Sequence, residues 1–148
     1  MDKILAGIAA IEDICFGPGV ESQTRLGVFI ELMCEGIMLG GVLPPEIFWP
    51  AFLSVWNACD CTWPYQRDLL RLLRNANRQS RAREYMGDAE NANFFDDLPE
   101  LIPVYRGCAR RRIRGISWTT DHDVALKFAR GIRFDREPDR VLVDVPEV

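Results

Sequence analysis

The stretch from residue 104 to residue 129 constrains the fold of this chain most, because strand-like and helix-like runs follow one another within it. The first run is rich in β-forming residues and ends in Arg106 and Gly107, where the glycine lets another backbone or a ligand come close. The second run carries Ser117 and Thr119, whose hydroxyls share one face because side chains alternate along a strand. The sequence therefore predicts two short strands.

A helix is predicted directly after the second run. Thr120 and Asp123 have the spacing of a capping box, which opens a helix by satisfying its first N–H groups. The apolar stripe of this helix consists of Val124, Ala125, Phe128 and Ala129. Residues 140–145 place a valine at every second position and predict a further strand.

Three motifs in this stretch are Tyr-Arg-Gly, Gly-x-Ser-Trp-Thr and Ala-Leu-Lys-Phe-Ala. In this order they resemble the Arg-Ser-Glu class of ADP-ribosyltransferases, and more closely the small bacterial and phage proteins that carry the first two motifs. The resemblance covers residues 98–145. It implies a split β-sheet that binds NAD, with Arg106 gripping the phosphate or ribose and Ser117 and Thr119 lining the nicotinamide site.

The same resemblance implies a glutamate on a later strand, which stabilises positive charge on the ribose as nicotinamide leaves. After Gly-x-Ser-Trp-Thr the sequence holds only Glu137, in an Arg-Glu-Pro-Asp loop, and Glu147, the penultimate residue. We therefore expect a transferase fold shortened before its catalytic glutamate, and no catalytic residue.

The N-terminal region is predicted to be helical, because apolar residues recur there every three or four positions. The clearest stripe should pack on its own domain and consists of Leu26, Phe29, Ile30, Met33, Cys34, Ile37 and Met38. A helix is also predicted from Pro50 to Ala58, and the aromatic cluster around it should fill the core: Phe48, Trp49, Phe52, Trp56 and Trp63.

The predicted fold class is therefore α+β. About four to five helices should form in residues 1–97, and a small sheet resembling part of the ADP-ribosyltransferase fold in residues 98–148. The two regions are expected to pack as one compact unit.

Two groups of arginines are candidates for binding a partner. A helix predicted from Pro64 to Asn77 carries the first group on one face: Arg67, Arg71, Arg74 and Arg78. The loop after the first strand carries the second group: Arg110, Arg111, Arg112 and Arg114. Each group could dock on an acidic protein surface or contact a phosphate, and the alternative for each is a plain solvated surface.

Charge and cysteine content narrow the function classes. The first sixty residues carry two basic and eight acidic side chains (2 − 8 = −6), while residues 101–148 carry ten basic and seven acidic ones (10 − 7 = +3). The net charge of −4 argues against direct nucleic-acid binding.

Glu31 and Glu35 interrupt the apolar run 28–43, so no membrane span is expected. Five cysteines without a visible secretion signal indicate reduced thiols and a cytoplasmic protein, and Cys59-x-Cys61 lacks the companions of a zinc site.

The function predicted from these features is a non-catalytic protein-binding module on a shortened ADP-ribosyltransferase-like fold. Such a module would occupy the surface of an acidic partner protein, as phage counter-defence inhibitors of the anti-CRISPR type do. The alternative is an active NAD-dependent mono-ADP-ribosyltransferase that modifies a protein. NAD is a possible cofactor under both hypotheses, and no metal is expected.

Overall fold

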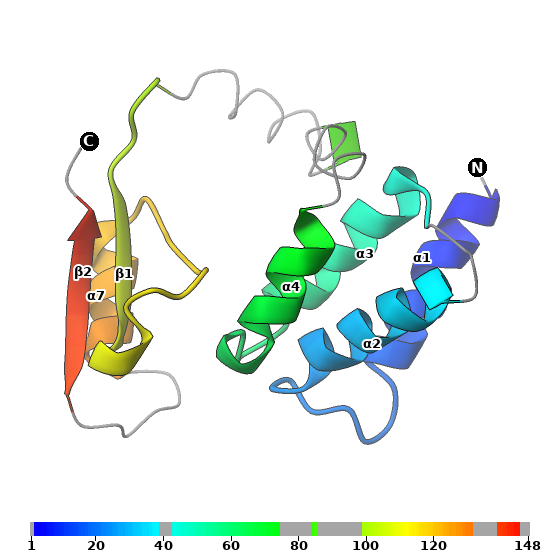
Figure 1. Ribbon diagram of the computed structural model, residues 1–148, viewed down its shortest axis with the longest axis horizontal. Helices are drawn as coiled ribbons and strands as arrows, with labels where there is room; N and C mark the ends of the chain where they lie inside the picture. The colour runs from blue at the N-terminus through cyan, green and yellow to red at the C-terminus, as the bar shows by residue number, and fades with distance from the viewer. Residues whose placement is uncertain (1, 39–42, 75–83, 86–98, 132–138, 146–148) are drawn as a thin grey trace. The chain divides into compact units, whose positions relative to one another are not determined.

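A computed structural model gives the structure of the chain and describes residues 2–38, 43–74, 84–85, 99–131 and 139–145. Within these residues the fold is α+β, as predicted, with five α-helices and one two-stranded antiparallel sheet (Figure 1). The chain divides into two compact units, Met1–Asp96 and Asp97–Val148. The expectation that the two regions pack as one unit stays a prediction.

The described part of the first unit is helical. Its α-helices are α1 (Asp2–Cys15), α2 (Arg25–Met38), α3 (Pro45–Asn57) and α4 (Gln66–Leu73), and the 3-10 turn η1 (Trp63–Tyr65) precedes α4. Helix α1 packs mainly against α3, and α2 contacts α1, α3 and α4. Their inward faces supply the core, which consists of Ile11, Cys15, Leu26, Phe29, Ile30, Met33, Phe48, Trp49, Ala51, Phe52, Val55, Leu69 and Leu72.

Aromatic rings from α2 and α3 form the centre of this core. Phe48 stacks on Phe52 with 6.0 Å between ring centroids, and Phe29 of α2 lies 5.7 Å from Phe48. The predicted aromatic core is therefore confirmed for the α3 rings. Trp63 was wrongly included, since 36% of it is exposed on η1.

Two predictions in the helical unit need correction. Helix α3 begins at Pro45 and not at Pro50, because a proline needs no N–H at the first helical position; Pro50 lies within the helix. The predicted α2 stripe faces its own unit through its first members, but Cys34 is exposed. Among the other predicted members, the side chains of Ile37 and Met38 lie outside the described residues.

The described part of the second unit contains β1 (Val104–Ala109), the 3-10 turn η2 (Arg110–Arg112), α7 (His122–Ala129) and β2 (Arg140–Val145). Strands β1 and β2 are antiparallel, with Val104 opposite Val145 and Ala109 opposite Arg140. The predicted second strand is wrong in extent. It is a single bridge, in which Thr119 and Tyr105 exchange backbone hydrogen bonds of 2.8 and 3.0 Å.

Helix α7 lies against β1, and Gly107 allows the contact. A Cβ at this glycine would be 2.9 Å from the carbonyl carbon of Phe128, and closer still to the backbone of Ala125 and Ala129. The prediction that this glycine admits another backbone is confirmed, and the backbone is that of α7. Because side chains alternate along β1, Arg106 and Cys108 project from the opposite side of the sheet.

The start of α7 lies one residue later than predicted. The N-cap is Asp121, whose Oδ1 accepts hydrogen bonds from the N–H groups of Asp123 (2.8 Å) and Val124 (3.0 Å). A carboxylate accepts both bonds, so Thr120 is not needed as a cap. The predicted stripe is correct for Ala125, which is fully buried, but Phe128 is 40% exposed.

Candidate functional site

Arg106 holds the loop between β1 and α7 in place. Its Nε donates to the carbonyl oxygen of Arg112 (3.2 Å), and its Nη1 donates to the carbonyl oxygen of Ser117. Gly115 lies against the guanidinium group, since a Cβ there would come within 2.9 Å of Nε and closer to the other guanidinium atoms. The guanidinium is therefore half-buried under the loop, with two of its nitrogens bonded to the backbone.

The two predicted hydroxyl residues lie in the same loop. Thr119 Oγ1 accepts a hydrogen bond from the N–H of Asp121 (3.1 Å), which leads the chain into α7. Trp118 Nε1 donates to the carbonyl oxygen of Gly115 (2.9 Å). The structure thus brings Arg106, Ser117 and Thr119 together, but Arg106 meets Ser117 through a backbone carbonyl and not across two facing strands.

The arginine-rich loop begins with η2. Arg110 forms an ion pair with Asp139, with 3.2 Å between Nε and Oδ1, and its N–H donates to the carbonyl oxygen of the same residue. Arg112 is half-buried, whereas Arg111 and Arg114 are exposed. These arginines lie on a loop whose backbone is fixed from beneath by Arg106. Glu137 and Glu147, the carboxylates that follow, lie outside the described residues.

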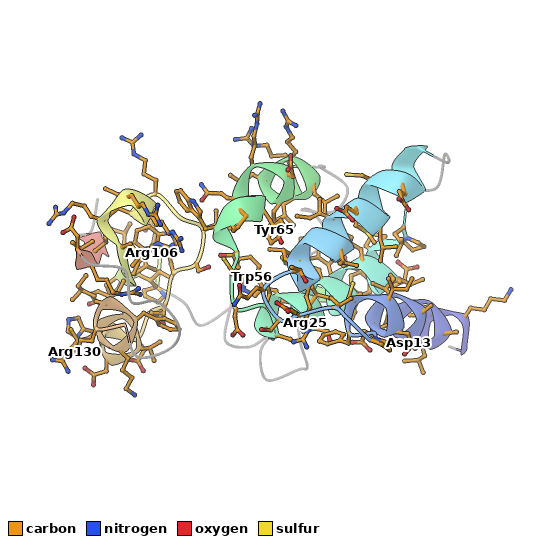
Figure 2. The ribbon with its side chains drawn as sticks, turned by 90° about the horizontal axis from the view of Figure 1, so that it is seen from below. Asp13, Arg25, Trp56, Tyr65, Arg106 and Arg130 are labelled. Atoms are coloured by element: carbon orange, nitrogen blue, oxygen red, sulfur yellow. The ribbon has the colours of Figure 1, made fainter. Side chains whose placement is uncertain are left out.

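Helix α4 presents a face of arginine and apolar side chains. Its buried side rests on Leu69 and Leu72. Residues at intervals of three and four share one side of a helix, and one side of α4 and its C-cap carries Arg67, Leu70, Arg71 and Arg74. We name these four residues, together with Trp63 of the preceding turn η1, the α4 face. Trp63 and Leu70 are 36% and 37% exposed, and all three arginines are exposed. In Figure 2, nitrogen-tipped side chains on α4 point away from the other helices of the unit.

The arginines of the α4 face have few acidic neighbours. Arg71 lies 3.6 Å from Asp68, and both side chains are more than half exposed, so this pair is weak. Arg67 and Arg74 have no ion pair among the described residues. The prediction that the arginines share an exposed helix face is confirmed for Arg67 and Arg71, and Arg74 is exposed as the C-cap of α4. The helix begins at Gln66 and not at Pro64, which lies in η1, and Arg78 lies outside the described residues.

Sequence reasoning missed the apolar half of this face. The sequence predicted that Trp63 belongs to the core, and it gave no prediction for Leu70. The signal lay in the spacing, because Leu70 is displaced from the buried stripe of Leu69 and Leu72 and falls between Arg67 and Arg74.

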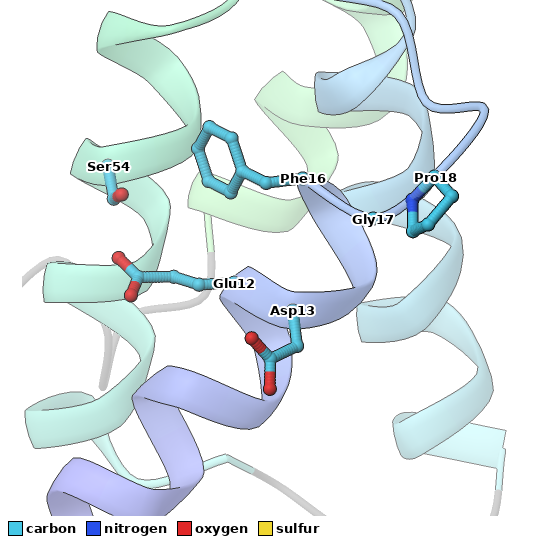
Figure 3. A pocket seen from close by; sticks show the side chains of 6 residues that line it. All are labelled: Glu12, Asp13, Phe16, Gly17, Pro18 and Ser54. Atoms are coloured by element: carbon cyan, nitrogen blue, oxygen red, sulfur yellow. The ribbon is translucent and has the colours of Figure 1, made fainter.

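A hollow of about 620 Å³ lies at the end of α1 and beside α3 (Figure 3). Carboxylates of Glu12 and Asp13 and the ring of Phe16 line it, with Ser54 on the opposite wall. The guanidinium carbon of Arg25 lies 4.8 Å from the centroid of the Phe16 ring, a cation–π distance. The hollow is open and acidic, in keeping with the negative charge of the first sixty residues.

Two other classes of site, a metal site and a membrane-spanning helix, can be checked in the described residues. Nowhere in them do three or more histidine, cysteine, aspartate or glutamate side chains cluster closely enough to hold a metal ion. No helix in the described part of the chain is long and apolar enough to cross a bilayer.

Comparison with known proteins gives no match to a family model, a curated protein or a solved structure. The resemblance to ADP-ribosyltransferases therefore rests on the sequence motifs alone. The function proposed below is therefore argued from the contacts and exposure of the described residues.

Proposed function

We propose that this protein is a non-catalytic binding module that docks on an acidic surface of a partner protein through the α4 face. The observation that carries the proposal is the set of three exposed arginines on one side of α4 and its C-cap, next in the chain to the exposed Trp63 of η1. Tryptophan and arginine are the residues that most often dominate the energy of protein interfaces. An arginine also pairs in a bidentate manner with carboxylates, which makes an acidic partner the best match.

Rigid support makes this face suitable for docking. Leu69 and Leu72 anchor α4 in the core, and the ring of Tyr65 in η1 packs against Gly27 of α2. A Cβ at Gly27 would come within 2.6 Å of that ring. Because η1 and α4 are fixed, the exposed side chains lose less freedom when a partner binds.

The contacts of Arg106 favour this proposal over the alternative, an NAD-dependent mono-ADP-ribosyltransferase. In that enzyme the guanidinium would bind NAD, but here two of its nitrogens are bonded to the carbonyls of Arg112 and Ser117. A transferase would also need a fixed carboxylate, and losing one such charge-stabilising group costs about 100- to 1,000-fold in rate. The resemblance implies roles for Arg106, Ser117 and Thr119 as NAD ligands, whereas under our proposal Arg106 supports the loop instead.

The biological class that we propose is a phage-type counter-defence inhibitor, similar in action to anti-CRISPR proteins. It would work by covering the surface of its partner. The acidic, helix-rich first unit supports this class. The five cysteines are free thiols, which is compatible with a reducing cytoplasm as the site of action.

We expect charge reversal of the α4 face to weaken binding to an acidic protein surface strongly. The probe is a fluorescent peptide rich in glutamate and leucine, and the measurement is anisotropy at physiological salt. The triple variant Arg67→Glu/Arg71→Glu/Arg74→Glu should weaken binding about 100-fold, because each attractive pair becomes repulsive. Trp63→Ala should weaken it about tenfold or more, as expected for a buried interface tryptophan.

The matched control is Lys3→Glu/Lys127→Glu/Arg130→Glu. These three side chains are exposed and basic but lie outside the α4 face, and their reversal changes the net charge equally. This variant should bind the peptide nearly as well as wild type. An equal loss in both triple variants would mean that net charge alone drives binding, and the docking proposal would be wrong.

A further inference from the structure

A short turn between α3 and η1 carries two cysteines. Cys59 and Cys61 are both half-buried free thiols, separated by Asp60. The Cys59 thiol donates to the carbonyl oxygen of Cys61, with 3.3 Å between sulfur and oxygen. This bond places the sulfur of Cys59 beside the backbone of Cys61. Trp56 and Tyr65, labelled in Figure 2, precede and follow this turn in the chain.

Hydrogen bonds from the α1–α2 connection fix the turn. The N–H of Asp60 donates to the carbonyl oxygen of Ser22 (3.1 Å), and Ser22 Oγ donates to Asp60 Oδ2 (2.6 Å). Arg25 Nη1 donates to the carbonyl oxygen of Ala58 (2.9 Å), just before the first cysteine. Because Asp60 lies between the cysteines, its two bonds hold both of them in place.

Tyr65 lies near both cysteines of the turn. Burial raises the pKa of Tyr65, and the neighbouring Cys59, Cys61 and Glu31 raise that pKa further. Both thiols therefore lie within electrostatic reach of one hydroxyl group. This agrees with the hydrogen bond between the two cysteines.

We propose that Cys59 and Cys61 form a preorganised dithiol site for a soft, thiophilic centre that takes two thiolates, such as trivalent arsenic. Thiolates prefer soft centres, and two of them on one fixed turn bind as a chelate. Zinc is a poor fit because a structural zinc site takes four ligands. The site goes beyond partner docking, since none of its residues belongs to the α4 face.

The remaining cysteines serve as internal controls. Cys15 is fully buried, and burial, with Glu12 nearby, raises its pKa to about 11, so its thiol stays protonated and unreactive. Cys108, a residue of β1, is also buried. Cys34 is exposed, with no second cysteine within two positions of it in the sequence. A reagent that needs two thiols therefore distinguishes the turn from the other cysteines.

The test uses the reduced full-length protein, an equimolar amount of phenylarsine oxide and intact mass spectrometry. Two As–S bonds form while the arsenic–oxygen bond breaks, and the oxygen leaves as water with the two thiol protons, without any change in oxidation state. Wild type and Cys34→Ser should each retain a single phenylarsenic group in excess glutathione. Cys59→Ser and Cys61→Ser should each hold it about 100-fold more weakly, because a single thiol loses the chelate.

The variant Asp60→Ala tests the fixed turn itself. It keeps both thiols but removes the carboxylate that accepts from Ser22, so retention of the arsenical should fall about tenfold. Circular dichroism checks that each variant is folded. Where a cysteine-to-serine variant does not fold, the corresponding cysteine-to-alanine variant is used. Loss of the arsenical from wild type as readily as from Cys59→Ser would overturn the proposal, and so would equal retention by wild type and Asp60→Ala.

Discussion

Replacement of Gly107 by valine is expected to unfold the second unit. A Cβ at this position would lie 2.9 Å from the carbonyl carbon of Phe128 and closer to the backbone of Ala125 and Ala129. These are helix backbone atoms and cannot rotate away as a side chain would. Helix α7 would have to leave β1, exposing Ala125, which is fully buried. We expect a loss of more than about 3 kcal/mol in the stability of this unit.

Hydrogen exchange measured by mass spectrometry checks this prediction unit by unit. Amides of β1 and α7 should lose their protection in Gly107→Val, while those of α2 and α3 keep theirs. The control is Gly19→Ala, because a Cβ there meets nothing within 4 Å and its cost is limited to the positive φ of 85°. That cost is about 1 to 2 kcal/mol. Unchanged protection of β1 in Gly107→Val would contradict the close contact with α7.

The replacement Phe48→Ala should have the second largest effect, in the helical unit. The Phe48 side chain is fully buried and contacts the rings of Phe29, Trp49 and Phe52. Its removal leaves a cavity between α2 and α3, and a buried phenylalanine replaced by alanine costs about 3 to 5 kcal/mol. Denaturation in guanidinium chloride, followed by circular dichroism at a helix wavelength, measures this loss.

The control for the core prediction is Leu5→Ala. Leu5 lies on α1 and is 61% exposed, so its replacement should change the free energy of unfolding by no more than about 0.5 kcal/mol. Similar losses in the two variants would show that the aromatic cluster is not the centre of the core.

Much of the fold could be predicted from local sequence patterns. The α2 stripe predicts its buried face because helical periodicity depends only on residue spacing, as Leu26 and Phe29 illustrate. Residues 140–145 were predicted as a strand from their alternation, and β2 has these bounds. Cap and start positions were less predictable. Both Thr120 and Asp121 can cap a helix, and the choice depends on which side chain the loop brings to the first N–H groups.

The candidate site was less accessible to sequence reasoning. The resemblance implied Arg106 and Ser117 on neighbouring strands, but Ser117 lies in the loop after β1 and meets Arg106 through its backbone carbonyl. That bond exists because the loop folds back over β1, with Gly115 leaving room for the guanidinium. Close approach between residues distant in the chain depends on loop conformation, which no local pattern encodes.

Nuclear magnetic resonance of the arginine Nε–H groups during an NAD titration tests the central claim, that Arg106 supports the loop of a non-catalytic binding module. Arg106→Lys assigns the resonance, and nicotinamide release is followed in the same sample. Because Nε donates to the carbonyl oxygen of Arg112, we predict a resonance that excess NAD does not shift, and no nicotinamide release. A shift of this resonance together with nicotinamide release that Glu137→Gln or Glu147→Gln abolishes would contradict the claim and establish the transferase.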